Sequence, residues 1–172
     1  NPKTIVVDPR RTELAKNADL WLQLRPGTDD ALALAMLHTI IEEKLYDAAF
    51  VSEWTHGFEA LAERVKRYSP EWAAPITWVP AEKIRAAARL YAATKPSMME
   101  WGCAIEHTPN TIQTVRAISM LPALTGNIDV PGGWVFGMKG LGRFPSLIEN
   151  LTPEMNAKRL GADRFKMLSG EG

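Results

Sequence analysis

The chain has 172 residues, of which 46% are hydrophobic and 23% are charged, and its 20 basic side chains balance 20 acidic ones. This composition is typical of one globular domain, and the balanced charge argues against nucleic acid or an anionic membrane surface as a partner. A single cysteine excludes an intrachain disulfide and a multi-cysteine metal site, and no apolar run approaches the roughly 18 residues of a membrane span.

The amino-terminal part of the chain alternates strand-like and helix-like segments. Thr4 to Val7 is a β-branched run that predicts a strand, and Arg11 to Asn17 predicts a short helix. Leu20 to Leu24 predicts a second strand, with bulky apolar residues on both faces as in a buried parallel sheet. Asp29 to Glu43 has apolar residues at helical spacing and acidic residues in its first turn. The alternation predicts an α/β fold, a doubly wound parallel sheet with helices on both faces.

A helical excursion is predicted in the middle of the chain. The spacing of apolar residues predicts helices over Tyr46 to Trp54, Phe58 to Tyr68 and Ala81 to Thr94. Three prolines between residues 70 and 80 predict a loop before the last of these helices, and Pro80 suits the first turn of that helix. We expect this excursion to lie away from any ligand.

A third strand is predicted over Ser97 to Trp101, and it turns at Gly102 into a polar segment. Thr111 to Leu124 predicts a returning helix that ends at Gly126-Asn127.

The composition changes after these elements and predicts two regions. Residues 1–135 form the first region, which is predicted to be one α/β domain. Residues 136–172 are predicted to be a glycine-rich loop and a poorly structured tail, with a weak helical pattern at Pro153 to Leu160. If the chain is part of a longer protein, this tail lacks the neighbours against which it would pack.

Polar residues follow the first two predicted strands at their carboxyl ends, where open α/β sheets bind ligands. A glycine there lets the backbone approach a ligand, and a helix amino terminus offers free N–H groups. The candidate binding residues at these two strand ends are Asp8, Pro9, Arg10, Gly27, Thr28 and Asp29.

The third predicted strand supplies the opposite wall of the same crevice. Its candidate residues are Trp101 and Gly102 at the strand end, with Glu106 and His107 beyond. His107 is also readily explained as a surface or capping histidine. Cys103 is expected to be a small residue packed behind the strand end, rather than a metal ligand.

Five sequence blocks, in this order, closely resemble the molybdopterin oxidoreductase family, the bis-molybdopterin guanine dinucleotide enzymes that include formate dehydrogenases, periplasmic nitrate reductases and acetylene hydratase. The resemblance extends from Lys3 to Gly133. The blocks are Asp-Pro-Arg-Arg-x-Glu-Leu-Ala from Asp8, Pro-Gly-Thr-Asp from Pro26, Glu-Glu-Lys-Leu-Tyr-Asp from Glu42, Trp-Gly-Cys-Ala-Ile-Glu-His from Trp101, and Leu-Thr-Gly-Asn-Ile-Asp-Val-Pro-Gly-Gly from Leu124.

The resemblance implies that this chain is an internal piece of a longer enzyme, the second of its two Rossmann-like cofactor-binding domains. It implies molybdopterin guanine dinucleotide, carrying molybdenum or tungsten, as the cofactor. The metal ligand and an iron–sulfur cluster would lie in other parts of the enzyme. The implied partners are the remaining domains and an iron–sulfur electron-transfer subunit. The isolated piece is expected to be inactive and to lack the cofactor.

The resemblance also assigns roles to individual residues. Asp29 matches an aspartate of the guanosine-binding set, and a carboxylate can accept hydrogen bonds from both N1–H and the 2-amino group of guanine. The alternative is an ordinary helix N-cap or first-turn acid. Asp8 would lie against the same dinucleotide. The family has glutamine where Glu106 stands, which puts a direct pterin contact by Glu106 in doubt, whereas His107 near the pterin could move protons.

The sequence alone leaves other interpretations open. Arg10 and Arg11 are either solvated charges or partners of phosphates. Two further functions remain: a free-standing nucleotide-binding module, and a subunit-interaction domain that uses the tryptophan-rich faces.

Overall fold

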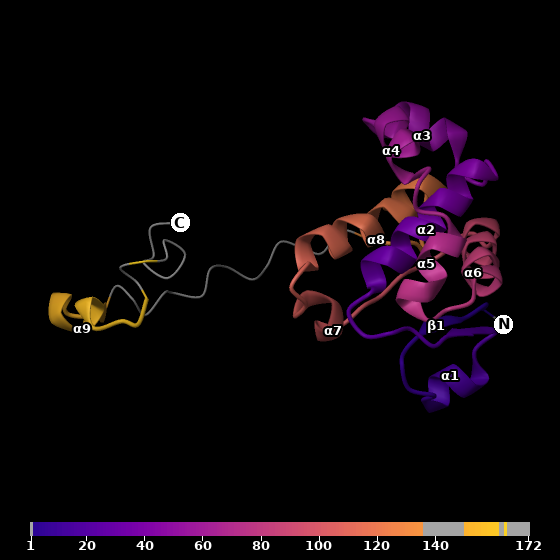
Figure 1. Ribbon diagram of the computed structural model, residues 1–172. Coiled ribbons are helices and arrows are strands. Elements are labelled where there is room, and N and C mark those ends of the chain that lie inside the picture. The colour runs from indigo at the N-terminus through magenta and orange to yellow at the C-terminus, as the bar shows by residue number, and fades with distance from the viewer. Residues whose placement is uncertain (1, 136–149, 162–163, 165–172) are drawn as a thin grey trace. The chain divides into compact units, whose positions relative to one another are not determined.

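The computed structural model describes residues 2–135, 150–161 and 164. The chain divides into two units, Asn1–Phe136 and Gly137–Gly172. The first unit is mostly helical and has a small two-stranded parallel sheet (Figure 1). In the second unit the described residues include one short helix, α9 (Pro153–Ala157), whose cap Thr152 accepts a hydrogen bond from the backbone N–H of Met155. No helix in these described ranges is long and apolar enough to cross a membrane.

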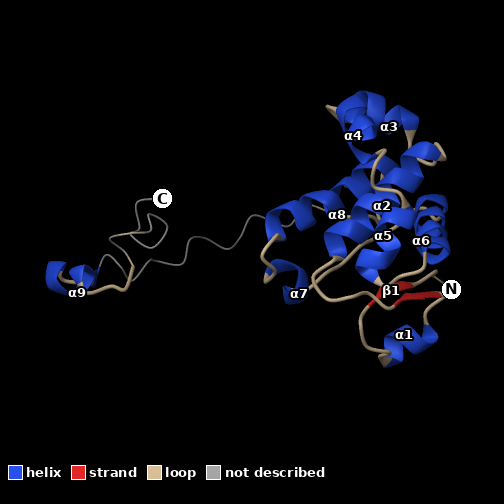
Figure 2. Cartoon of the chain, in the orientation of Figure 1, coloured by secondary structure: helices blue, strands red, loops and turns tan. Residues whose placement is uncertain are grey.

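The sheet consists of β1 (Ile5–Val7) and β2 (Leu20–Leu22), which run in the same direction with Val6 opposite Trp21 (Figure 2). Helix α1 (Glu13–Asn17) forms the crossover between them, as parallel strands require. Helix α1 contacts both strands, and α6 (Ala81–Ala93) contacts β2 from the opposite side. The strand pair therefore has helices on both faces.

The main hydrophobic core surrounds α2 (Asp29–Glu42), whose side chains Leu37 and Ile40 are fully buried. Because α2 is apolar on most of its surface, it needs cover on several sides. That cover comes from α6 and from three further helices, α4 (Phe58–Val65), α5 (Pro70–Thr77) and α8 (Thr111–Thr125). Two shorter helices, α3 (Ala48–Trp54) and α7 (Cys103–Glu106), pack against α8.

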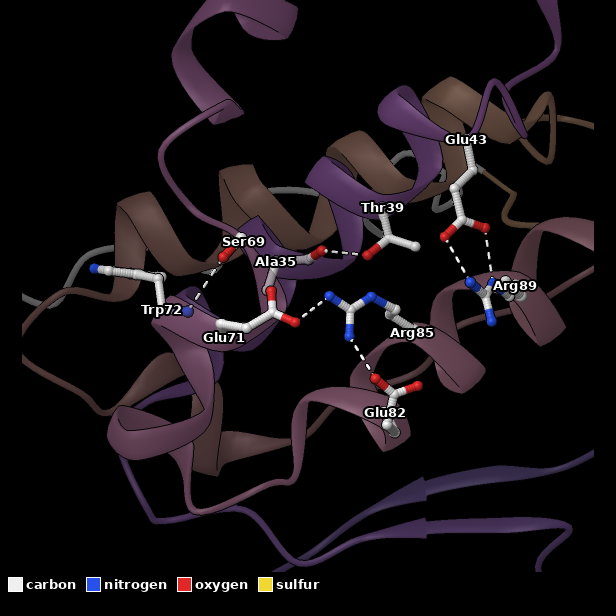
Figure 3. Close-up of polar contacts among 9 residues, drawn as sticks. All are labelled: Ala35, Thr39, Glu43, Ser69, Glu71, Trp72, Glu82, Arg85 and Arg89. Carbon is white, nitrogen blue, oxygen red and sulfur yellow. Dashed lines mark hydrogen bonds and ion pairs between the residues drawn. The ribbon is translucent and has the colours of Figure 1, made fainter.

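Surface ion pairs join α6 to the end of α2 and to α5 (Figure 3). Arg89 of α6 donates two hydrogen bonds, of 2.7 and 2.8 Å, to the carboxylate of Glu43 at the end of α2. Arg85 of α6 pairs with Glu71 of α5 and with Glu82. The Arg89 guanidinium lowers the pKa of Glu43 by hydrogen bonding to its carboxylate. Most of these groups are exposed, so each pair contributes at most about 1 kcal/mol.

The structure confirms most predicted helices and the first two strands, and it corrects two predictions. The proline-rich stretch is not a loop, because it contains α5. Ser69 caps this helix, Pro70 occupies its first turn, where no N–H bond is lost, and Ala73 and Thr77 are buried.

The predicted third strand, Ser97 to Trp101, is the second correction, because no strand forms there. The segment has no strand partner among the described residues, and a strand exists only by pairing. The described chain thus has a two-stranded parallel sheet, and the larger doubly wound sheet is not seen. The glycine-rich loop predicted after residue 136 lies mostly outside the described residues.

Candidate functional site

A cavity of about 840 Å³ lies within the first unit. Its walls are mostly apolar and come from β1, α2, α6, the middle of α8 and the segment that leads from α6 to α7. The volume is within the range of ligand pockets, about 300–1,000 Å³. Six of the residues singled out in the sequence line this cavity: Asp8, Pro9, Gly27, Asp29, Trp101 and Gly102.

The other four candidate residues do not line the cavity. Arg10 is exposed, and its backbone N–H donates to Asp8 Oδ1 at 2.7 Å. Thr28 is buried, and its hydroxyl donates to the carbonyl of Arg25 at 2.7 Å. Glu106 and His107 are exposed at the end of α7. The structure therefore gives Thr28 a local role in the turn, and it gives Glu106 and His107 no cavity contact.

The loop after β1 is fixed by side chains of the neighbouring strand. The indole Nε1 of Trp21 donates to the carbonyl of Asp8 at 2.9 Å, and Nε2 of Gln23 donates to the carbonyl of Pro9 at 3.1 Å. Asp8 in turn accepts the Arg10 N–H in an Asx turn. These bonds hold the Asp8 carboxylate at the cavity rim.

The turn before α2 presents Asp29 to the same rim. Gly27 has φ +78°, a left-handed conformation that other residues avoid, and this turns the chain into the helix. Asp29 is half-buried, and no other described residue donates a hydrogen bond to its carboxylate. Burial raises the pKa of Asp29 above its usual value, because a carboxylate loses hydration there.

The adjacent Asp30 has a different environment. Its carboxylate accepts a hydrogen bond of 2.7 Å from Nδ2 of Asn110, the residue before α8. Asp30 therefore ties α2 to α8, while the Asp29 carboxylate accepts no hydrogen bond from any other residue in the described part of the chain. Thr28 occupies the N-cap position of α2, so Asp29 is not the N-cap, but Asp29 is an acidic residue of the first helical turn, as the alternative interpretation also predicts.

The opposite wall is held by a buried asparagine, Asn127, which is not among the site residues that the sequence predicts. Asn127 is 1% exposed, and its side chain accepts the Ser97 N–H at 3.0 Å and donates to Thr125 Oγ1 at 2.8 Å. Its carbonyl accepts the N–H of Trp134 at 2.7 Å, and the rings of Trp101 and Trp134 lie edge to face 5.3 Å apart. Asn127 thus fixes both tryptophan-bearing segments, and only its position after a helix-ending glycine hinted at this.

The charge of the lining limits what the cavity can bind. Its charged groups are Asp8, Asp29, Glu100 and Lys3, and the ammonium of Lys3 already pairs with Asp19 at 2.8 Å. Glu100 was missed as a candidate because it lies inside the predicted third strand. An anionic group would be repelled from this rim, whereas a ligand edge made of hydrogen-bond donors would be stabilised. The described residues include no cluster of His, Cys, Asp and Glu that could hold a metal ion.

Known proteins similar to this chain share its sequence along most of its length. Acetylene hydratase of Syntrophotalea acetylenica is 38% identical over 99% of this chain and 24% of its own length. Formate dehydrogenase H of Escherichia coli is 44% identical over 80% of this chain and 19% of its own length. The solved structure of acetylene hydratase from Pelobacter acetylenicus matches 72% of this chain and 17% of that chain, with a TM-score of 0.71 and 45% identity.

The chain therefore spans about a quarter or less of these relatives. The family model for molybdopterin oxidoreductases matches residues 1–170. On this match and on the relatives above, the chain belongs to the molybdopterin oxidoreductase family.

Proposed function

We propose that the polar rim of the cavity binds the guanosine end of a molybdopterin guanine dinucleotide in a larger oxidoreductase. The observation that carries this proposal is the Asp29 carboxylate, which is half-buried, lines the cavity and accepts no hydrogen bond from another described residue. Guanine offers two adjacent donors, N1–H and the 2-amino group, and one carboxylate can accept both. The residues present fit a purine of this kind.

The remaining rim residues support the same ligand. Gly27 and Gly102 have no atom within 4 Å of the space where a Cβ would stand, so a ligand can approach the backbone closely. Trp101 adds an aromatic surface at the rim. Asp8 supplies a second acceptor, fixed by its Asx turn. The acidic rim favours the nucleoside over the phosphates, so Arg10 and Arg11, outside the cavity, are the proposed phosphate partners.

When bound, the cofactor supplies redox or hydration chemistry at molybdenum or tungsten. The residues of this chain bind and orient one end of it. The protein ligand to the metal, the other cofactor-binding domain and an electron-transfer partner with iron–sulfur clusters are proposed to lie outside this chain. The two described strands are proposed to belong to a larger, doubly wound Rossmann-like sheet.

Exchange of Asp29 for asparagine in the parent enzyme tests the site. Asp29→Asn replaces an acceptor pair with one carbonyl and one amide donor, and the donor faces the donors of guanine. Loss of a hydrogen bond to a charged group, about 1.5–3 kcal/mol, predicts binding about 10- to 100-fold weaker. The measurement is the guanosine monophosphate released from the denatured, acid-treated enzyme per mole of protein, under limiting cofactor supply.

Asp30→Asn is the matched control. It makes the same charge change one residue away, at a carboxylate that Asn110 already occupies. We expect nearly normal nucleotide release from this variant. Equal release from both variants and the unchanged enzyme would refute the assignment of Asp29.

A further inference from the structure

Two stretches of backbone that have no hydrogen-bond partners among the described residues border the apolar part of the cavity. The first is the outer edge of β1. Leu20 donates to the carbonyl of Thr4, and Asp8 donates to the carbonyl of Leu22, so Thr4 and Asp8 direct their backbone groups toward β2. Alternate residues of a parallel strand face opposite neighbours. Ile5 and Val7 therefore direct their N–H and carbonyl groups away from β2, and both residues line the cavity.

The second stretch is the extended segment of residues 98–101, between α6 and α7 (Figure 1). None of its backbone N–H or carbonyl groups has a hydrogen-bond partner within the described part of the chain. All four of its residues line the same cavity as Ile5 and Val7. Backbone groups removed from water need partners, so two such stretches around one apolar space form an incomplete arrangement.

The two stretches run in the same direction. The carboxyl end of the segment, Trp101, packs against the small hydrophobic cluster that includes Ala33, in the second turn of α2. The carboxyl end of β1 leads to Asp8, which shares the rim with Asp29 in the first turn of α2. Both ends therefore lie near the amino terminus of α2. A strand inserted between them can run parallel to each and pair with both.

We infer that the cavity is the slot for one more parallel β-strand, supplied by the part of the parent enzyme that this chain does not include. The relatives are at least four times as long as the portion matched here, so such a polypeptide exists in them. The apolar side chains that face the slot, among them Leu32, Met36 and Leu121, suit a strand buried on both faces. This inference rests on the larger sheet proposed above and is independent of the guanosine site.

The inserted strand would convert residues 98–101 into the third strand that the sequence predicts. It would also leave the polar rim open, because ligands bind beyond the carboxyl ends of the strands. The rim and the slot would then be two parts of one cavity, with a ligand at the mouth and protein in the interior.

Hydrogen exchange in the full-length parent enzyme tests the slot. If a strand pairs with both edges, the amides of Val7 and of alternate residues within 98–101 should exchange about tenfold or more slowly than in the present chain alone. Proline at position 7 removes the outward N–H without touching the bonds to β2. In the parent, Val7→Pro should therefore restore fast exchange in residues 98–101.

Val7→Ala is the matched control, because it shortens the same side chain and keeps the N–H; slow exchange should persist in that variant. Fast exchange at both edges in the unchanged parent would overturn the inference. Protection in the present chain that grows with its concentration would overturn it in favour of a second copy. Protection that does not depend on concentration, but disappears when the chain is shortened to end at Val135, would also overturn the inference. It would mean that the chain's own tail pairs with the two edges. Nucleotide release is also measured for the Val7 variants, so that failure of the inserted-strand inference can be distinguished from failure of the guanosine site.

Discussion

The helices around α2 and the cavity wall opposite them differ in how much of their apolar and backbone surface the described residues cover. On the helical side, Leu37 and Ile40 are fully buried, and ion pairs close the surface above them. On the cavity side, Val7 is 43% exposed and Met98 is 64% exposed. The first region has a closed core formed by the described residues. The second has apolar side chains and backbone groups that suit a partner, which is the expected pattern where a domain continues into other parts of a protein.

Truncation of one side chain in each region provides the largest contrast. Leu37→Ala leaves a cavity in a closed core and should lower the free energy of unfolding by about 3 kcal/mol. Val7→Ala removes a side chain that is already partly in water and should cost less than about 0.5 kcal/mol in the present chain. Urea unfolding followed by circular dichroism measures both. Equal losses would mean that the cavity wall is as well packed as the core.

Asn127 is where the two regions meet, and its replacement should have the next largest effect. Asn127→Ala leaves the Ser97 N–H without its buried acceptor and should cost about 2 kcal/mol. Because Ser97 begins the cavity wall, its amide should also exchange faster. Asn17→Ala, at an exposed asparagine at the end of α1, is the control and should cost less than about 0.5 kcal/mol. A similar loss of free energy of unfolding in both variants would show that Asn127 does not join the two regions.

The smallest effect is a gain of stability at the rim. Burial raises the folded-state pKa of Asp29, so its ionised form destabilises the folded chain. Asp29→Asn should therefore raise the free energy of unfolding near neutral pH, by at most about 1 kcal/mol. The gain should shrink as the pH falls through the raised pKa of Asp29 and vanish below its unfolded value of about 3.9. Unfolding curves at several pH values measure this, and a loss of stability at neutral pH would contradict it.

The sequence predicted the elements whose signals are local. β-branched residues marked β1, apolar spacing marked α2, and a glycine marked the end of α8. It failed where the outcome depends on distant residues. Residues 98–101 have the composition of a strand, but pairing requires a neighbour that the described chain does not provide.

The candidate site residues also divide into those that local signals locate and those whose positions depend on distant residues. Strand ends and the Pro-Gly-Thr-Asp turn located Asp8, Gly27 and Asp29, because backbone geometry places them. Glu106 and His107 were chosen for their chemistry within a segment whose path sequence alone does not define, and they lie outside the cavity. The separate roles of Asp29 and Asp30 depend on Asn110, which is 80 positions away in the sequence from Asp30.

The edge-to-face pair of Trp101 and Trp134 has an optical consequence. Two indole rings 5.3 Å apart are close enough for their electronic transitions to couple, and one of them forms part of the cavity lining. Whatever enters that space changes the surroundings of this pair. The near-ultraviolet circular dichroism difference between the protein and its Trp101→Phe variant therefore isolates a built-in reporter of occupancy, with no added label.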